Sequence, residues 1–172
     1  MEFKVEQIAF FPAPNCVPRA LALLTELGFN CGKEWVHDVV AARGEVFGRP
    51  AAPVGHLAFA YQELAQPLEL EVLSYEAGQK NWMQSVPSPA ISHIAMHCTS
   101  MELDAWHKKL TALDIRVVQT VITESHTNPV IAGKRRYHYV IYGTRGIIGC
   151  DLKFIVRYNP DMTPYASAAA ED

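Results

Sequence analysis

Hydrophobic and polar positions along the chain form a succession of short segments, most of which alternate with the period of a β-strand. One early segment differs: Val17, Leu21 and Leu24 recur at spacings of three and four residues, which predicts a helix over residues 15–27. The strands predicted around this helix cover residues 3–11, 35–47, 55–61 and 68–75. The order predicted for the first half of the chain is therefore β-α-β-β-β.

The same order starts again after residues 76–90, where glutamine, glycine, proline and serine are frequent and indicate a linker. Thr99 and Glu102 have the spacing of a capping box, which predicts the start of a second helix. The strands predicted in this half cover residues 91–98, 115–123, 136–142 and 147–157. We divide the chain into a βαβββ module at 1–76, a linker at 77–90, a second βαβββ module at 91–158 and a flexible tail at 159–172.

Aligning the two halves supports an internal repeat. His56 and His138 are separated by 82 positions, and so are Glu71 and Lys153, although the two pairs lie on different predicted strands. Two equal offsets on separate strands indicate that one module has been duplicated. The question then becomes what lies between two similar halves.

Strand alternation gathers polar side chains on one face of several strands, opposite an apolar face that is expected to pack under the helices. The residues on the polar face are Gln7, Glu69, Glu71, His93, His97, Asp151 and Lys153. Polar groups near the middle of strands are unfavourable unless they line a cavity. Amide oxygen, carboxylate and imidazole are ligands for a divalent metal, which would act as a Lewis acid with open positions for substrate.

The composition of the chain excludes some classes of function. Apolar residues make up 49% of the chain, charged residues 19%, and the formal net charge is −3. There is no basic surface of the kind that binds nucleic acid, and no apolar run long enough to cross a membrane. The first residues do not form a signal peptide, so the cytoplasm is expected. The four cysteines are far apart in the sequence and predict reduced thiols rather than a disulfide framework.

The repeated β-α-β-β-β order resembles the vicinal oxygen chelate superfamily, which includes glyoxalases, bleomycin-resistance proteins and extradiol dioxygenases. Two short motifs add to it: ISHIAMHC after the linker and LELEVLSY at the end of the first module. The resemblance implies an α+β fold in which two tandem modules form a curved mixed sheet, as half-barrels around a cleft, with the helices outside. It also implies a small-molecule ligand in the cleft and a homodimer.

In the glyoxalase pattern, each module supplies ligands from its first and its last strand. Carried over to this sequence, the implied ligands are Gln7, Glu71 and His93, with Glu71 also serving as the catalytic base. The fourth position holds Lys153, and a protonated lysine cannot coordinate a cation. Asp151 lies on the same face two residues earlier and is the expected substitute. The metals implied by the resemblance are Zn, Ni, Fe and Mn.

Other polar residues of the predicted strands are expected to line the substrate pocket: His56, Glu69, His97, His138 and Lys153. In the extradiol dioxygenase pattern, His93 and His138 would supply the two imidazoles. Three functions stay open. The first is metal-assisted lyase, isomerase or dioxygenase chemistry on a small oxygen-rich molecule. The second is non-enzymatic binding of the bleomycin-resistance type, with a degenerate metal site. The third is a structural or partner-binding role with a vestigial cleft, in which Lys153 bridges Glu71.

Overall fold

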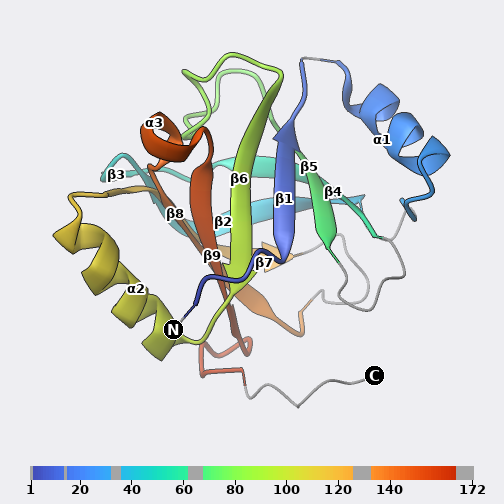
Figure 1. The fold of residues 1–172 in the computed structure, drawn as a ribbon. Coiled ribbons are helices and arrows are strands. Elements are labelled where there is room, and N and C mark those ends of the chain that lie inside the picture. The colour runs from blue at the N-terminus through green and yellow to red at the C-terminus, as the bar shows by residue number, and fades with distance from the viewer. Residues whose placement is uncertain (1, 14, 32–35, 62–67, 126–132, 166–172) are drawn as a thin grey trace.

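The computed structural model describes residues 2–13, 15–31, 36–61, 68–125 and 133–165, and they follow the predicted order (Figure 1). The first module contains β1 (Gln7–Phe11), α1 (Val17–Glu26), β2 (Val36–Val46), β3 (Arg49–Pro50), β4 (Val54–Ala60) and β5 (Glu69–Tyr75). The second contains β6 (Ala90–His97), α2 (Ser100–Ala112), β7 (Val117–Ser125), β8 (Arg136–Tyr142), α3 (Arg145–Ile148) and β9 (Asp151–Tyr158). Among these residues no helix is long and apolar enough to cross a membrane.

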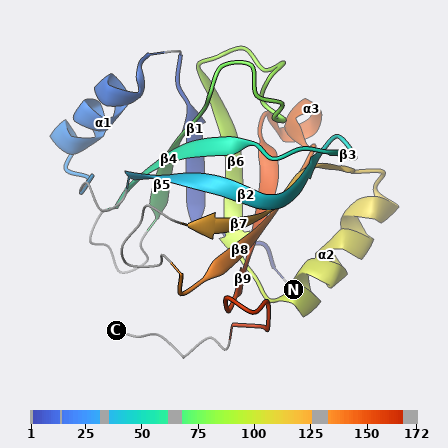
Figure 2. The ribbon, with the colours of Figure 1, turned by 180° about the vertical axis from the view of Figure 1, so that it is seen from behind.

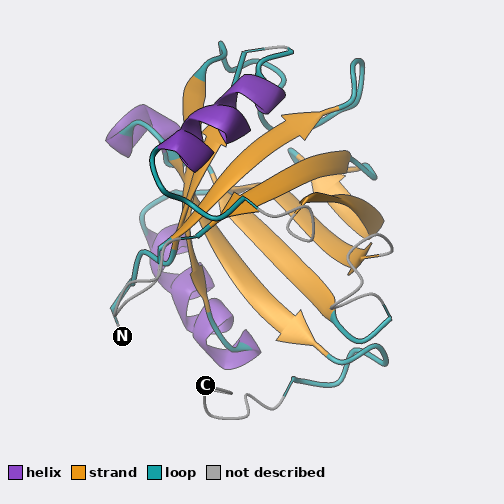
Figure 3. Ribbon diagram, turned by 90° about the vertical axis from the view of Figure 1, so that its right-hand side faces the viewer, coloured by secondary structure: helices purple, strands orange, loops and turns teal. Residues whose placement is uncertain are grey.

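Within the described residues, nine strands form one mixed sheet in the order β3-β2-β4-β5-β1-β6-β9-β8-β7. The first strand of each module pairs in parallel with the last strand of that module, β1 with β5 and β6 with β9. The two modules meet where β1 and β6 pair antiparallel. The sheet is strongly curled (Figure 3), which confirms the predicted curved mixed sheet built from two βαβββ units.

The curl goes far enough for the two outer parts of the sheet to join, because β2 also pairs antiparallel with β7 (Figure 2). Gly44 of β2 lies opposite Val121 of β7 at this seam. A Cβ atom on Gly44 would lie 2.6 Å from Val121 Cγ1 and 2.9 Å from the carbonyl oxygen of Thr120, so glycine permits the close approach. The half-barrels therefore close into a ring, and eight strands enclose an interior that side chains fill or that holds one small ligand.

Helix α2 covers the outer face of the second module. Thr99 and Glu102 form the predicted capping box, in which the Thr99 hydroxyl accepts from the Glu102 N–H and the Glu102 carboxylate accepts from the Thr99 N–H. The core under this helix consists of Met96, Leu103, Leu110, Val140, Tyr142, Phe154 and Val156. Phe154 and Val156 belong to the face of β9 that was predicted to be apolar. Polar Lys153, between Phe154 and Leu152, must therefore point to the inside of the barrel.

The chain departs from the sequence prediction between β8 and β9. The sequence predicts a strand over residues 147–157, but helix α3 comes first and β9 begins only at Asp151. The Asp151 carboxylate accepts from the Arg145 backbone N–H at 3.0 Å, and the Thr144 hydroxyl donates to the Cys150 carbonyl at 2.8 Å. These side-chain bonds close a helical turn that hydrophobic alternation does not reveal.

The tail predicted over residues 159–172 lies partly outside the described residues, which end at 165. In the described part, the Asn159 N–H donates to the Thr163 carbonyl at 2.9 Å and Tyr158 forms a bridge with Pro164. Residues 163 and 164 thus lie beside the end of β9.

Candidate functional site

Four buried polar side chains meet inside the barrel, one from each of the four central strands. Gln7 comes from β1, Glu71 from β5, His93 from β6 and Lys153 from β9. Their exposed fractions are 2%, 1%, 1% and 4%, so water has almost no access to them. Burial of such groups is tolerated only when they satisfy one another. The structure therefore brings together the three principal ligands implied by the resemblance, and places a lysine among them.

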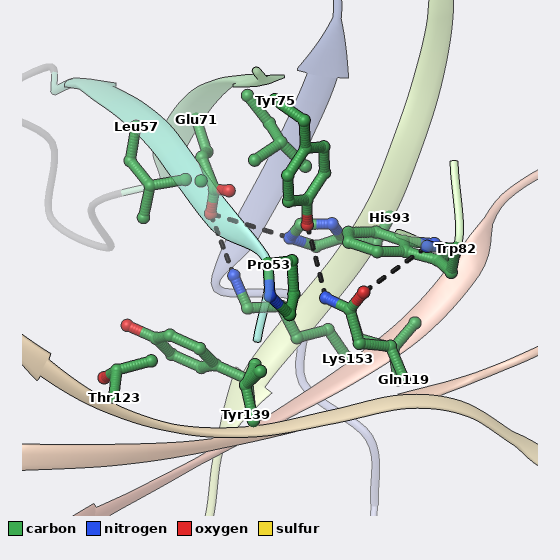
Figure 4. A pocket seen from close by; sticks show the side chains of 14 residues that line it. Pro53, Leu57, Glu71, Tyr75, Trp82, His93, Gln119, Thr123, Tyr139 and Lys153 are labelled. Atoms are coloured by element: carbon green, nitrogen blue, oxygen red, sulfur yellow. Dashed lines mark hydrogen bonds and ion pairs between the residues drawn. The ribbon is translucent and has the colours of Figure 1, made fainter. Parts of the chain in front are cut away.

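Lys153 bonds to two members of this group. Its ammonium nitrogen donates to Gln7 Oε1 at 3.1 Å. It also donates to Glu71 Oε2 at 2.9 Å, a bond visible in Figure 4. It also lies 4.5 Å from the centre of the Tyr139 ring, where the negative face of the ring favours a cation. A buried ion pair is stable when hydrogen bonds of this kind complete it.

The orientation of His93 is fixed by its neighbours. Its Nε2 atom lies 3.0 Å from Gln7 Oε1, and its Nδ1 atom lies 3.0 Å from the hydroxyl of Ser92. The Gln7 side-chain nitrogen donates to Glu69, so the Gln7 oxygen must face the centre and accept. His93 is therefore a neutral imidazole that donates from Nε2 and accepts at Nδ1. Burial, followed by repulsion from the Lys153 ammonium, lowers the pKa of His93 to about 4.

Glu71 is ionised at neutral pH. Burial alone would raise its pKa, but the Lys153 ammonium and the His93 imidazole outweigh this effect and lower the pKa of Glu71 to about 2. The His93 Nε2 atom lies 3.6 Å from Glu71 Oε2. The group thus carries one positive and one negative charge that cancel.

A cavity of about 40 Å³ adjoins this group inside the barrel. Its polar wall contains Glu71, His93, Lys153, Gln119 and Thr123, and its other walls are apolar or aromatic. The latter are Pro53, Gly55, Leu57, Leu73, Tyr75, Trp82, Val121, Tyr139 and Ile141. Apolar walls with a few convergent polar groups are typical of a small-molecule site. A volume of this size holds no more than a few water molecules.

A segment of the linker contributes Trp82 to the wall of the cavity (Figure 4). We call residues 81–83 the linker strap, and its members Asn81, Trp82 and Met83 are 5%, 5% and 1% exposed. The Trp82 indole N–H donates to Asp151 Oδ2 at 3.1 Å, and the Trp82 backbone N–H donates to Gln119 Oε1 at 3.3 Å. The linker was not expected to reach the cavity. The signal in the sequence was the pair of large apolar residues, Trp82 and Met83, inside a polar linker.

Comparisons with known proteins agree with this architecture. No family model matches the sequence, and no curated protein matches it. Among solved structures, a triple mutant of 4-hydroxymandelate synthase from Streptomyces coelicolor aligns with a TM-score of 0.55 and 6% identity, over 91% of this chain and 49% of that chain. At 6% identity this likeness shows a shared fold alone, the curled sheet of two βαβββ modules that the resemblance to the vicinal oxygen chelate superfamily implies.

Two further similar structures have lower TM-scores. A hypothetical protein from Bacillus halodurans C-125 aligns with a TM-score of 0.49 and 13% identity, over 90% of this chain and 94% of that chain. Methylmalonyl-CoA epimerase from Mycobacterium tuberculosis aligns with a TM-score of 0.45 and 14% identity, over 88% and 85%. The metal, the homodimer and the cytoplasmic location stay predictions.

Asp151, the predicted substitute ligand, is engaged elsewhere in the fold. Its carboxylate pairs with the Arg145 guanidinium at 3.1 Å and accepts from the Trp82 indole. Arg145 also donates to the carbonyl oxygens of Ile91 and Ser92. Asp151 therefore fastens α3 and the linker strap to the sheet.

Two of the predicted pocket residues lie towards one end of the barrel. Glu69 accepts from the Gln7 amide and from the Tyr61 hydroxyl, and so orients the Gln7 side chain. His97 lies 2.9 Å from Glu6 Oε2 and 3.2 Å from the guanidinium of Arg157. His97 lines a separate depression near the start of α2 rather than the barrel cavity.

The two remaining predicted pocket residues also fall outside the lining of the barrel cavity. His56 lies 3.9 Å from Glu76 and is 40% exposed. His138 lies 2.8 Å from the Thr120 hydroxyl. Its neighbour Tyr139 lines the barrel cavity, so alternation along β8 directs His138 to the opposite face.

The donor set does not fit a divalent metal ion. Within the described ranges, no three histidine, cysteine, aspartate or glutamate side chains lie close enough together to hold one. Glu71, His93 and Gln7 would supply three donor atoms, but the fourth position belongs to an ammonium that has no lone pair to give. The same ammonium would repel a divalent cation placed among these donors.

Proposed function

We propose that the protein binds a small, neutral organic molecule in the barrel cavity without the help of a metal ion. The main support for this proposal is the position of Lys153, whose ammonium lies 2.9 Å from Glu71 and 3.1 Å from Gln7 at the polar end of an apolar cavity. This proposal corresponds to the bleomycin-resistance type of function, in which the cleft holds a ligand and performs no reaction.

The protonation state of Glu71 favours binding over catalysis. A general base works best when its pKa lies near the working pH, and the pKa of Glu71 is lowered to about 2. A carboxylate of this kind is a weak proton acceptor at neutral pH. The metal-assisted lyase, isomerase and dioxygenase reactions would in addition need a ligand in place of Lys153.

The charges and walls of the cavity indicate the kind of ligand. Lys153 and Glu71 neutralise each other and His93 is uncharged, so a charged ligand would lose its hydration without gaining a counterion. Tyr75, Trp82 and the aliphatic walls favour a flat apolar molecule with a hydrogen-bonding group at one end. Because the cavity holds only about 40 Å³, side chains of its wall must move to admit a ligand of this kind, and we expect the Trp82 indole to be among them.

Indole and phenol are suitable probes because each is neutral, flat and carries one donor. We expect either probe, added in the presence of a chelator, to cause a saturable shift of the Trp82 indole N–H resonance, assigned with a Trp82→Phe variant. The shift follows from loss of the bond to Asp151. Leu57→Phe adds bulk to the cavity wall and should weaken the binding. His138→Gln changes a residue outside the cavity lining and should leave binding unchanged.

Two results would contradict the proposal. One is the absence of a saturable shift at millimolar probe concentrations. The other is binding that disappears when the chelator is added, which would restore a metal-dependent function.

A second candidate function is a structural or partner-binding role in which the cleft is vestigial. The small volume of the cavity and the buried linker strap favour it. This function predicts that neither indole nor phenol binds to wild type. It also predicts that Leu57→Phe does not change the response of the protein to either probe.

A further inference from the structure

We propose that the Lys153 ammonium occupies the place of a divalent metal ion, and that the remaining donors are already arranged so that one substitution would create a metal centre. Whether an ammonium or a metal ion lies among these side chains is independent of which molecule enters the cavity.

The register of the strands shows that Lys153 is the counterpart of Glu71. In the first module Gln7 pairs with Glu69 of β5, so Glu71 lies two positions beyond that partner. In the second module His93 pairs with Asp151 of β9, so Lys153 lies two positions beyond. The two modules thus present equivalent pairs to a common centre, and a glutamate at position 153 would reach that centre as Glu71 does.

The spacing of the present donors is that of metal ligands. Bonds of about 2.0–2.2 Å to a metal place neighbouring ligand atoms roughly 2.8–3.6 Å apart in octahedral or tetrahedral geometry. His93 Nε2 lies 3.0 Å from Gln7 Oε1 and 3.6 Å from Glu71 Oε2. Both separations fall in this range without any movement of the backbone.

Each of these donors is also held by a second contact. Glu69 accepts from the Gln7 nitrogen and so turns the Gln7 oxygen to the centre. The Ser92 hydroxyl contacts His93 Nδ1 at 3.0 Å and leaves Nε2 directed at the centre. When Nε2 binds a metal the imidazole proton must move to Nδ1, and the Ser92 hydroxyl can then accept it in a hydrogen bond. Such outer contacts set the orientation of metal ligands.

Charge explains why the present site excludes a metal. The ammonium of Lys153 already neutralises Glu71, and it contacts the same two oxygen atoms that a metal would need. Replacement of Lys153 by glutamate would leave two buried carboxylates with one amide and one imidazole. A divalent cation would then balance the charge in competition with protonation of a carboxylate, so metal binding and stability should become coupled.

The test compares wild type, Lys153→Glu, Lys153→His and Lys153→Met in titrations with Ni²⁺, Zn²⁺ and Mn²⁺. We expect no saturable binding by wild type. Lys153→Met removes the ammonium but adds no donor, and it should bind metal more weakly than Lys153→Glu does. Lys153→Glu should bind one equivalent, with affinity rising about a thousandfold from the millimolar to the micromolar range. Lys153→His should bind one equivalent more weakly. Adding His93→Ala to Lys153→Glu should abolish the binding. Metal should raise the melting temperature of Lys153→Glu most, that of Lys153→His less, and that of wild type not at all.

Several results would overturn the proposal. One is a wild-type protein that binds one equivalent of metal and loses it in His93→Ala. Another is a pair of folded Lys153→Glu and Lys153→His variants that bind none. A Lys153→Glu variant that stays unfolded both with and without metal would show that the donors are not arranged as inferred. None of these results changes the binding of indole or phenol by wild type, so the two proposals fail separately.

Discussion

The ion pair between Lys153 and Glu71 allows a quantitative test of the site. At 2.9 Å, and with an effective dielectric constant of about 20, two unit charges attract by about 6 kcal/mol. Loss of hydration offsets much of this attraction, but removal of one partner leaves the other charge buried, at a cost of about 3–5 kcal/mol. We therefore expect Lys153→Met and Glu71→Gln each to lower the free energy of unfolding by about that amount.

The double variant should be more stable than either single variant, because it leaves no buried charge without a partner. This corresponds to a coupling energy of about 3 kcal/mol or more, measured by urea denaturation of the four proteins at neutral pH. The exposed pair of Asp114 and Arg116, at 3.5 Å, is the matched control and should show almost no coupling. A coupling of less than about 0.5 kcal/mol between Lys153 and Glu71 would refute the geometry on which both proposals rest.

Four further changes test other parts of the structure. Because burial lowers the pKa of His93 from 6.5 to about 4, the unfolded chain takes up the proton first as the pH falls. This contribution to stability is complete above pH 6.5 and should be lost as the pH falls towards 4. When the urea midpoint is measured against pH, His93→Gln should not show this loss between pH 6.5 and pH 4. Trp82→Ala should cost about 3–5 kcal/mol and bind indole more tightly than wild type does, measured by the ligand-dependent rise in melting temperature. Gly44→Val should open the seam between β2 and β7 and speed amide exchange in β7, since even a Cβ would lie 2.6 Å from a neighbouring side chain. Thr99→Ala should cost about 1 kcal/mol in thermal unfolding by removing the cap of α2.

The repeated element order and the inward face of the central strands could be predicted because both depend on local periodicity. Alternation along β5 and β9 is enough to place Glu71 and Lys153 on one side, opposite Leu70 and Phe154. The equal offset of the two residues then predicts that they are equivalent. Their contact follows from the pairing of β1 with β6, which brings the two modules together.

Other features depend on contacts that the sequence does not encode locally. The repeat offset predicts that His56 and His138 are equivalent, but it does not say which face of the sheet they occupy, and both lie outside the cavity lining. The path of the linker strap depends on Asp151 and Gln119, which are 69 and 37 positions away from Trp82. No periodic pattern marks a segment whose course is set by single distant hydrogen bonds.

The linker strap forms part of the cavity wall through Trp82, beside a sheet that closes between β2 and β7. A ring of paired strands cannot widen without breaking backbone hydrogen bonds along a whole seam. The strap contacts the cavity wall through the Trp82 indole, held to Asp151 at 3.1 Å, and through one backbone bond to Gln119 at 3.3 Å. Displacing Trp82 therefore breaks fewer bonds than opening the barrel. A ligand that cannot compensate for those bonds will be excluded, so weakening them with Gln119→Leu should raise affinity for indole without altering the charge of the site.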